Sequence, residues 1–358
     1  MGHDPLFQLG GTDDVRIHLC VYHARFPQVQ RSAIEHQLDQ AFNRRRPEAV
    51  YAVPDIRHAI DAHPEPHHLF VVLASPVCEV GRDWDADWAV AEPSSMRALI
   101  QLAGRVQRHR RKLDDRPNLL ILDTNLRHFK GERGPDGQPG PVFLRPGFEQ
   151  WRAPVGHPFR LLAHHLSKLM APEEYTTVSA LPRMVSRPLA DLKPQYRLVD
   201  LEHARMQDRM LPAVDEVGGR TLRREPNAAT AWRHSQAALT GMLQQRQPFR
   251  DDSQPSVMLA FLPDDEEEQL LLHRVEEERG RRGQTLYVEV DQSLRHDMDV
   301  PLGACISAWG EHDLIGLLIE QSDYLNLPLR RCAEKLATIS APKSDQGWWY
   351  HPWLGLTR

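Results

Sequence analysis

The stretch Gln101-Leu-Ala-Gly-Arg-Val-Gln-Arg-His-Arg-Arg-Lys112 completes a strand–helix–strand pattern in the first third of this chain. It has the form Q-x-x-G-R-x-x-R and follows Pro93-Ser94-Ser95, which is typical of a helix start. Arg105 and Arg108 are three positions apart, so on a helix they share one face and can reach the γ-phosphate of an ATP held by another domain. The glycine before Arg105 lets such a helix approach a facing domain closely.

The sequence around this stretch alternates between strand and helix patterns. Strands are predicted at Val15–Tyr22 (VRIHLCVY), His68–Ser75 (HLFVVLAS) and Asn118–Leu122 (NLLIL). The second of these is almost continuously apolar, which is typical of a strand buried on both sides. After Pro27 a helix is predicted, with Ile34, Leu38, Ala41 and Phe42 on one face. This alternation predicts an α/β domain with a parallel sheet and helices on its faces.

The remainder of the chain has a different character. A Gly- and Pro-rich loop between 129 and 150 marks a domain edge, so we expect an α/β domain at 1–128, a loop and helical linker at 129–200, and a mainly helical α+β domain at 201–358. The elements predicted in this last part are helices at Thr230–Gln245 and Asp313–Leu336, strands at Val257–Leu262 and Thr285–Val290, and a solvated acidic turn at Asp264–Glu268.

Composition places the chain among ordinary globular proteins. Its 358 residues suffice for two domains, with 41% hydrophobic and 26% charged residues and a formal net charge of −5. This charge argues against a wholly basic nucleic-acid coat, although a local basic groove is compatible with it. The four cysteines are far apart, and no apolar run is long enough to span a membrane. We therefore expect reduced thiols and a cytoplasmic location.

Two further groups of residues suggest a ligand site. Ser75, Gly81 and Asp83 form the pattern S-x-x-x-x-x-G-x-D at the end of a predicted strand, where open α/β sheets bind ligands. His23 and Arg25 follow the first strand and are placed to contact a phosphate backbone. Taken alone, the first pattern is compatible with a chance match at the end of a buried strand, and the second group with a polar surface turn. Arg105 and Arg108 are likewise compatible with a plain basic helix.

The order of these motifs resembles one helicase family. The runs Tyr22-His-Ala-Arg-Phe-Pro27, Ser75-Pro-Val-Cys-Glu-Val-Gly-Arg-Asp-Trp-Asp-Ala-Asp-Trp88 and Ile100-Gln-Leu-Ala-Gly-Arg-Val-Gln-Arg108 are similar to the second RecA-like domain of the type I-F (Yersinia subtype) CRISPR helicase–nuclease, a superfamily two DNA helicase. Pro146-Gly-Phe-Glu149 and the aromatic ending Trp348–Gly355 are similar as well. The resemblance covers nearly all of this chain but only the C-terminal half of the family's protein, with a second helicase lobe, whole or incomplete, and an accessory domain.

The resemblance implies a role for each signature residue. In this family the protein translocates along single-stranded DNA opened by an RNA-guided surveillance complex, uses ATP, and degrades the strand with a metal-dependent nuclease domain. Carried over, the roles are arginine fingers for Arg105 and Arg108 with Gln101 orienting them, nucleotide contacts for Gly81, Asp83 and Gly104, and nucleic-acid contacts for Ser75, His23 and Arg25.

Two motifs that complete such an enzyme do not occur in this sequence. It contains neither the phosphate loop G-x-x-x-x-G-K-[ST] nor an acidic motif that would hold Mg²⁺. We therefore expect ATP and Mg²⁺ to be bound with a missing first helicase lobe, and the nuclease metal to lie outside this chain. Histidine–aspartate pairs at His296-Asp297 and His312-Asp313 lack partner histidines at suitable spacing, so we expect polar helix or loop positions there rather than nuclease ligands.

The chain by itself is thus expected to hydrolyse no ATP and to cut no DNA. Such a chain would arise from a truncated gene, a partial sequence or a split subunit. An alternative is a non-catalytic fragment that binds single-stranded nucleic acid through the basic run at 105–112 and the C-terminal tryptophans, or that docks on the surveillance complex.

Overall fold

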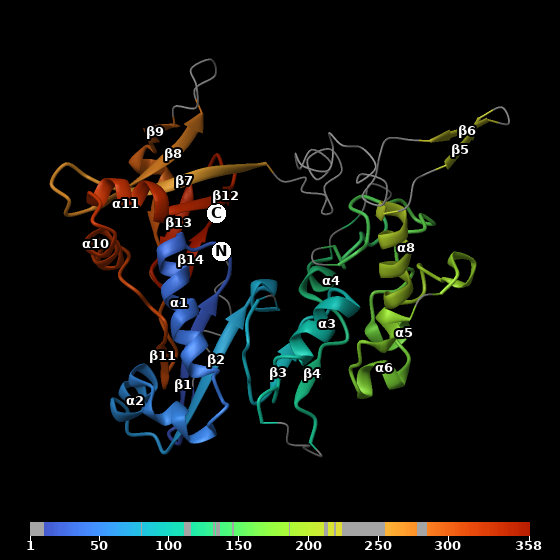
Figure 1. Cartoon of the computed structure of the whole chain (residues 1–358), viewed down its shortest axis with the longest axis horizontal. Helices are drawn as coiled ribbons and strands as arrows, with labels where there is room; N and C mark the ends of the chain where they lie inside the picture. Colours follow the sequence, from blue (N-terminus) through green and yellow to red (C-terminus); the bar gives the residue numbers. More distant parts are fainter. Residues whose placement is uncertain are drawn as a thin grey trace. The chain divides into compact units, whose positions relative to one another are not determined.

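A computed structural model describes residues 11–79, 81–110, 116–131, 133, 137–144, 147–185, 187–210, 214–217, 220–223, 255–277 and 285–358. Contacts between residues divide the chain into two compact units (Figure 1). Unit 1 combines Met1–Asp85 with Ser253–Arg358, and unit 2 is Ala86–Asp252. The two ends of the chain therefore fold into the same unit.

The described residues of unit 1 form one four-stranded sheet and two three-stranded sheets. Its elements are β1 (Val15–Tyr22), α1 (Gln28–Ala41), η2 (Pro47–Ala52), α2 (Pro54–Asp61), β2 (His67–Ala74), η3 (Pro76–Glu79), β7 (Ser256–Pro263), β8 (Leu270–Glu277), β9 (Thr285–Glu289), η6 (Gln292–Leu294), β10 (Arg295–Asp297), β11 (Ile306–Ala308), α10 (Leu314–Leu325), α11 (Leu329–Leu336), β12 (Thr338–Pro342), β13 (Trp348–His351) and β14 (Gly355–Thr357).

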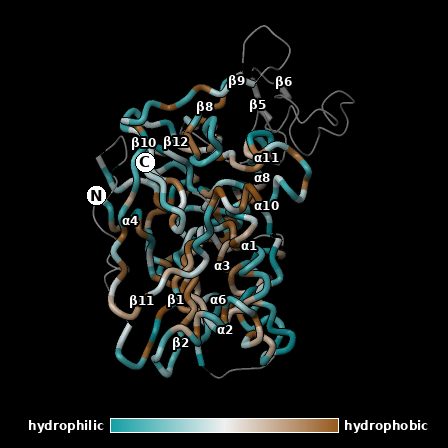
Figure 2. Tube along the Cα trace, turned by 90° about the vertical axis from the view of Figure 1, so that its left-hand side faces the viewer, coloured by the Kyte–Doolittle hydropathy of each residue, from teal (hydrophilic) through white to brown (hydrophobic). Residues whose placement is uncertain are grey.

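The first sheet of unit 1 has three parallel strands in the order β11-β1-β2. α1 packs on it, because Ile34 and Leu38 are fully buried in the same cluster as Cys20 and Tyr22 of β1. Hydrophobic residues, brown in Figure 2, run along β1, whereas the connecting turns are mostly hydrophilic. The predicted strands and the apolar face of α1 are confirmed. The prediction that the 68–75 strand is buried on both sides is wrong, because β2 lies at the sheet edge and is only half-buried.

The second sheet of unit 1 is antiparallel, in the order β12-β7-β8-β9, and it carries the helices α10 and α11 (Figure 1). Leu259 and Phe261 of β7 and Cys332 of α11 are buried in one cluster. A third sheet, β10-β13-β14, joins the same cluster through Trp348. Residues 255–277 and 285–358 thus hold eight strands and two α-helices, so the expectation of a mainly helical C-terminal domain is wrong for these ranges.

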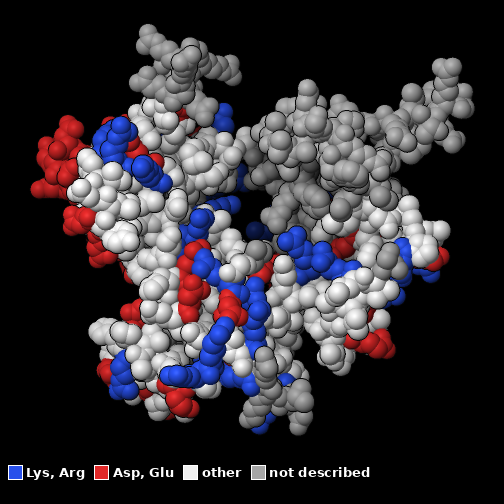
Figure 3. All heavy atoms as spheres, in the orientation of Figure 1, with Lys and Arg blue, Asp and Glu red and all other residues white. Residues whose placement is uncertain are grey.

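Two details of the C-terminal predictions can be compared with the structure. The predicted helix at Asp313–Leu336 is two helices, because Asn326 adopts a left-handed backbone (φ 49°) and Pro328 begins a new helix. The predicted solvated acidic stretch is confirmed: Asp264–Glu268 joins β7 to β8 and is largely exposed. Acidic side chains are red in Figure 3. The predicted helix at Thr230–Gln245 lies outside the described residues.

Unit 2 is mostly helical and contains the Q-x-x-G-R-x-x-R stretch. Its elements are β3 (Ala89–Ala91), α3 (Met96–Ala103), β4 (Leu119–Ile121), α4 (Leu126–Lys130), α5 (Leu166–Leu169), α6 (Pro172–Thr176), α7 (Leu181–Met184), η4 (Leu189–Asp191), α8 (Leu198–Met210), β5 (Val214–Val217) and β6 (Arg220–Arg223).

The core of unit 2 forms around the crossover between two parallel strands. β3 pairs with β4 from Ala89 opposite Leu119 to Ala91 opposite Ile121, and α3 connects the two strands. Met96 and Leu99 of α3 are buried against Leu198 and Leu201 of α8. The predicted strand at Asn118–Leu122 is confirmed as β4, but its parallel partner β3 was not predicted. The strands predicted as one parallel sheet, however, are divided between the sheets β11-β1-β2 and β3-β4.

Candidate functional site

The Q-x-x-G-R-x-x-R stretch begins inside α3. The side chain of Ser95 caps this helix by accepting a hydrogen bond from the amide of Ala98 (3.1 Å), as its position after Pro93 predicted. Gln101 lies in the last turn of the helix, which ends at Ala103, and Gly104 is the C-cap residue. Only the first part of the motif is therefore helical.

Arg105 and Arg108 lie beyond the helix, so the expectation that they share a helical face is wrong. The backbone at this point turns away to pair with Ala86, whose amide donates to the carbonyl of Arg105 (2.8 Å) and whose carbonyl accepts from the amide of Gln107 (2.9 Å). Gln107 adopts a left-handed backbone conformation (φ 49°), which an α-helix cannot contain. These contacts with the segment before β3 end the helix early.

The resulting turn still carries both arginines. Arg105 is half-buried, whereas Arg108 is exposed and its Nη1 donates to the carbonyl oxygen of Gly104 (3.3 Å). The geometry is thus a turn next to the end of α3 that carries one exposed arginine, Arg108, and one half-buried arginine, Arg105. Arginine side chains bind phosphate oxygens readily, because the guanidinium offers several donors in one plane.

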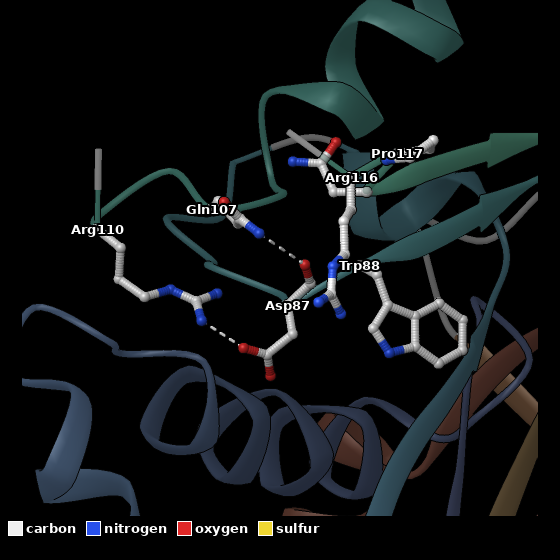
Figure 4. Close-up of a pocket in the computed structure, with 7 residues that line it drawn as sticks. Asp87, Trp88, Gln107, Arg110, Arg116 and Pro117 are labelled. Carbon is white, nitrogen blue, oxygen red and sulfur yellow. Dashed lines mark hydrogen bonds and ion pairs between the residues drawn. The ribbon is translucent and has the colours of Figure 1, made fainter. Parts of the chain in front are cut away.

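A pocket of about 410 Å³ lies beside this turn, at the amino ends of β3 and β4 (Figure 4). Arg110 forms an ion pair with Asp87 and donates to the carbonyl oxygen of Ala86 (3.0 Å). Sequence reasoning missed this pocket, because its residues come from three separate segments that meet only when β3 pairs with β4. The residues that line it are Asp87, Trp88, Gln107, Arg110, Arg116, Pro117 and Asn118.

The segment with Gly81 and Asp83 belongs to unit 1, where it is attached to α1. Gly81 has a positive φ of 74°, consistent with the tight turn expected there. Arg82 forms ion pairs with Glu35 and with Asp39 of α1 (2.9 Å to Asp39). Asp83 is paired with Arg45 (2.7 Å), so both ends of the turn are fastened to the same helix–loop region.

Ser75, His23 and Arg25 lie at one edge of the parallel sheet in unit 1. Because Tyr22 is opposite Ala74 in the paired strands β1 and β2, the residues that follow each strand meet at the carboxyl edge. The ring Nε2 of His23 lies 2.9 Å from the carbonyl oxygen of Leu354, and burial lowers the pKa of His23. Arg25 is exposed. The structure therefore brings the three predicted nucleic-acid contacts together.

The aromatic ending of the chain is part of the core. Trp348 and Trp353 are 2% and 1% exposed, and the indole of Trp353 donates to the carbonyl oxygen of Leu19 in β1 (2.7 Å). Trp348 donates to the carbonyl oxygen of Pro342 (2.9 Å). The alternative in which the C-terminal tryptophans stack on a single strand is thus wrong for these two residues.

Two features are absent from the described part of the chain. Within it, no group of three or more His, Cys, Asp or Glu side chains is arranged to hold a metal ion. The described helices also include none that is both long and apolar enough to cross a membrane.

Comparison with known proteins relates these features to a family. Two family models match: "CRISPR-associated nuclease/helicase Cas3, C-terminal" over residues 6–111 and "CRISPR-associated Cas3 subtype I-F/YPEST-like, C-terminal domain" over residues 261–358. A CRISPR-associated nuclease/helicase Cas3 subtype I-F/YPEST from Pseudomonas aeruginosa is 39% identical over 365 residues, which cover 99% of this chain. The chain belongs to the Cas3 subtype I-F/YPEST family. It corresponds to a C-terminal part of Cas3.

Other Cas3 proteins match less extensively. The Cas3 subtype I-F/YPEST of Pectobacterium atrosepticum is 37% identical over 274 residues, or 75% of this chain. The chain spans 31% of the Pseudomonas protein and 23% of the Pectobacterium protein. The crystal structure of T. fusca Cas3 aligns with 95% of this chain and 35% of its own length, at 17% identity and a TM-score of 0.34. That superposition is too loose to support a comparison of the folds.

Proposed function

We propose that this chain is the C-terminal part of an ATP-dependent single-stranded DNA translocase and helicase–nuclease of type I-F CRISPR interference, which unwinds and degrades invading DNA. The relatives are named nuclease/helicases, and the chain covers 31% of the Pseudomonas protein. The observation that carries the proposal is the turn after α3, where Arg105 and Arg108 follow Gln101 and Gly104 within the region matched by the family model.

In this proposal the turn serves as a pair of arginine fingers. Arg105 and Arg108 stabilise negative charge on a γ-phosphate in the transition state, and Gln101 orients them from the last turn of α3. Gly104, Gly81 and Asp83 contact the nucleotide. ATP with Mg²⁺ supplies the phosphoryl group whose transfer drives translocation. The residues present fit a γ-phosphate, but this sequence has no phosphate loop, so a different part of the enzyme must hold the nucleotide.

The DNA side of the proposal uses the carboxyl edge of the β11-β1-β2 sheet. Ser75, His23 and Arg25 gather there and contact the backbone of a single strand. The other partners are the RNA-guided surveillance complex and the nuclease and first helicase lobe. The family's domains are proposed at 1–128 for the second RecA-like lobe, 129–200 for a linker and 201–358 for the accessory domain, with the protein acting in the cytoplasm.

Reconstitution with the remainder of a relative tests the proposal. The purified chain is mixed with the N-terminal part of the Pseudomonas Cas3, the part that this chain does not match, and ATP hydrolysis is followed with and without single-stranded DNA. We expect neither polypeptide to hydrolyse ATP alone and the mixture to do so. Arg105→Ala should lower the rate by about 10³ to 10⁵.

A matched control tests whether the loss of any positive charge from unit 2 lowers the rate of hydrolysis, or only the loss of Arg105. Lys130→Ala removes one exposed positive charge from α4 of the same unit and should leave the rate unchanged. Hydrolysis by the chain alone would contradict the proposal, as would a mixture in which Arg105→Ala matches the wild type. An inactive mixture in which the chain still binds single-stranded DNA would favour the non-catalytic alternative.

A further inference from the structure

The pocket beside the arginine turn has the size and the position of a ligand site. Trp88 directly precedes β3, and Asn118 directly precedes β4, so the strand pairing sets the backbone positions of both residues. The volume of about 410 Å³ falls within the ~300–1,000 Å³ that small ligands occupy in proteins. The pocket is therefore large enough for one nucleotide unit.

The charges that line the pocket favour an anion. Two guanidinium groups, Arg110 and Arg116, accompany a single carboxylate, Asp87. Asp87 and the carbonyl oxygen of Ala86 both accept from Arg110, which holds its guanidinium in one orientation. A side chain that is already held loses little conformational entropy on binding, and a guanidinium presents several donors in one plane, a geometry that suits phosphate oxygens.

The remaining walls suit a nucleobase. Trp88 is 48% exposed, unlike the buried Trp84 four residues earlier. An exposed indole offers a flat face on which any base can stack. In Figure 4 the two guanidinium groups lie on either side of Asp87, with the indole of Trp88 beyond Arg116. The side-chain amides of Gln107 and Asn118 add donors and acceptors that can meet the edge of a base.

We propose that this pocket binds one nucleotide unit of single-stranded DNA, with its phosphate at Arg110 and Arg116 and its base stacked on Trp88. The site is separate from the γ-phosphate contact assigned to Arg105 and Arg108. Only one part of this proposal rests on the proposed function, namely that the bound nucleotide belongs to a DNA strand. A free nucleotide carries the same chemistry.

Fluorescence anisotropy measures the binding directly. The purified chain is titrated into labelled oligothymidylate at several salt concentrations, without ATP and without any partner polypeptide. Trp88→Ala should weaken binding by about 5- to 100-fold, and Trp88→Phe, which keeps a stacking ring, should restore most of it. Arg116→Ala should weaken binding and lower the dependence of log affinity on log salt concentration by about one.

Two controls remove similar side chains elsewhere in unit 2. Trp151→Ala removes a tryptophan that is 38% exposed, and Lys130→Ala removes an exposed charge. Both variants should bind like the wild type. Circular dichroism of every variant establishes that it is folded.

The outcomes discriminate between the sources of the nucleotide. Binding of labelled ATP that depends on Trp88 and Arg116, with no binding of oligothymidylate, would overturn the DNA source but support the nucleotide site. Equal affinity of all folded variants for both probes would overturn the site itself. Because these titrations contain no partner and measure no hydrolysis, a failed reconstitution leaves their result unchanged.

Discussion

Replacement of Trp353 by alanine should destabilise unit 1 strongly. Trp353 is 1% exposed and packs with Leu19 and Ile306, which belong to β1 and β11. Removing a buried aromatic ring costs about 3–5 kcal/mol. The lost indole hydrogen bond adds little, because the carbonyl oxygen of Leu19 also accepts from the amide of Trp309 (2.9 Å). Trp353→Phe keeps one aromatic ring but leaves the space of the five-membered ring unfilled, so it should cost less, about 1–2 kcal/mol.

Thermal unfolding followed by circular dichroism measures the effect. For a unit of this size each kcal/mol lowers Tm by roughly 2–4 °C, so Trp353→Ala should lower the unit 1 transition by roughly 6–20 °C. Trp151→Ala, at a half-exposed site of unit 2, is the matched control and should change that transition by less than 2 °C or so. If Trp353→Ala unfolds at the wild-type temperature, the C-terminal segment does not pack on β1, and the account of unit 1 is wrong.

Two further predictions concern buried polar groups. Burial lowers the pKa of His18 to about 4. His18 therefore becomes protonated below pH 6.5 in the unfolded chain but only below about pH 4 in the folded chain. The contribution of His18 to stability is constant above pH 6.5 and falls by up to about 3 kcal/mol between pH 6.5 and 4. Urea unfolding at several pH values should show this loss, and a His18→Gln variant with an equally steep pH dependence would contradict it. The buried carboxylate of Glu149 accepts from the amides of Val142, Phe143 and Leu161, each at 2.8 Å. Glu149→Ala leaves these donors without that acceptor and should lower the free energy of unfolding of unit 2 by about 3–5 kcal/mol, whereas a loss below 1 kcal/mol in urea unfolding would contradict this role.

Helices and strands were predictable where the pattern of neighbouring residues alone determines them. The apolar runs at β1 and β2 and the Ser95 cap of α3 are set by neighbouring residues, and the structure has them within a residue of the prediction. The early end of α3 was not predictable, because it depends on hydrogen bonds to Ala86, which lies outside the helix. Tertiary contacts overrode the helical spacing there.

Long-range pairing explains the other differences. β11 lies next to β1, although almost the whole chain separates them, and no local pattern marks that partner. The candidate site was predictable in part. The gathering of Ser75 and His23 follows from parallel pairing of two predicted strands, whereas the pocket around Trp88 required knowing that β3 and β4 are neighbours. The run Pro146–Glu149 was noted only because it resembles the family. That resemblance does not indicate that the Glu149 carboxylate accepts hydrogen bonds from three buried backbone amides.

The proposed arginine fingers can be tested most directly with a transition-state mimic. ADP with aluminium fluoride imitates a γ-phosphate during transfer, so only an enzyme that stabilises that state binds it tightly. In a mixture of this chain with the N-terminal part of the Pseudomonas Cas3, labelled ADP should be trapped by aluminium fluoride. Arg105→Ala should lose the trapped complex, while binding of ADP alone stays the same. Equal trapping with and without Arg105, or trapping by the N-terminal part alone, would contradict the claim that this chain supplies the fingers.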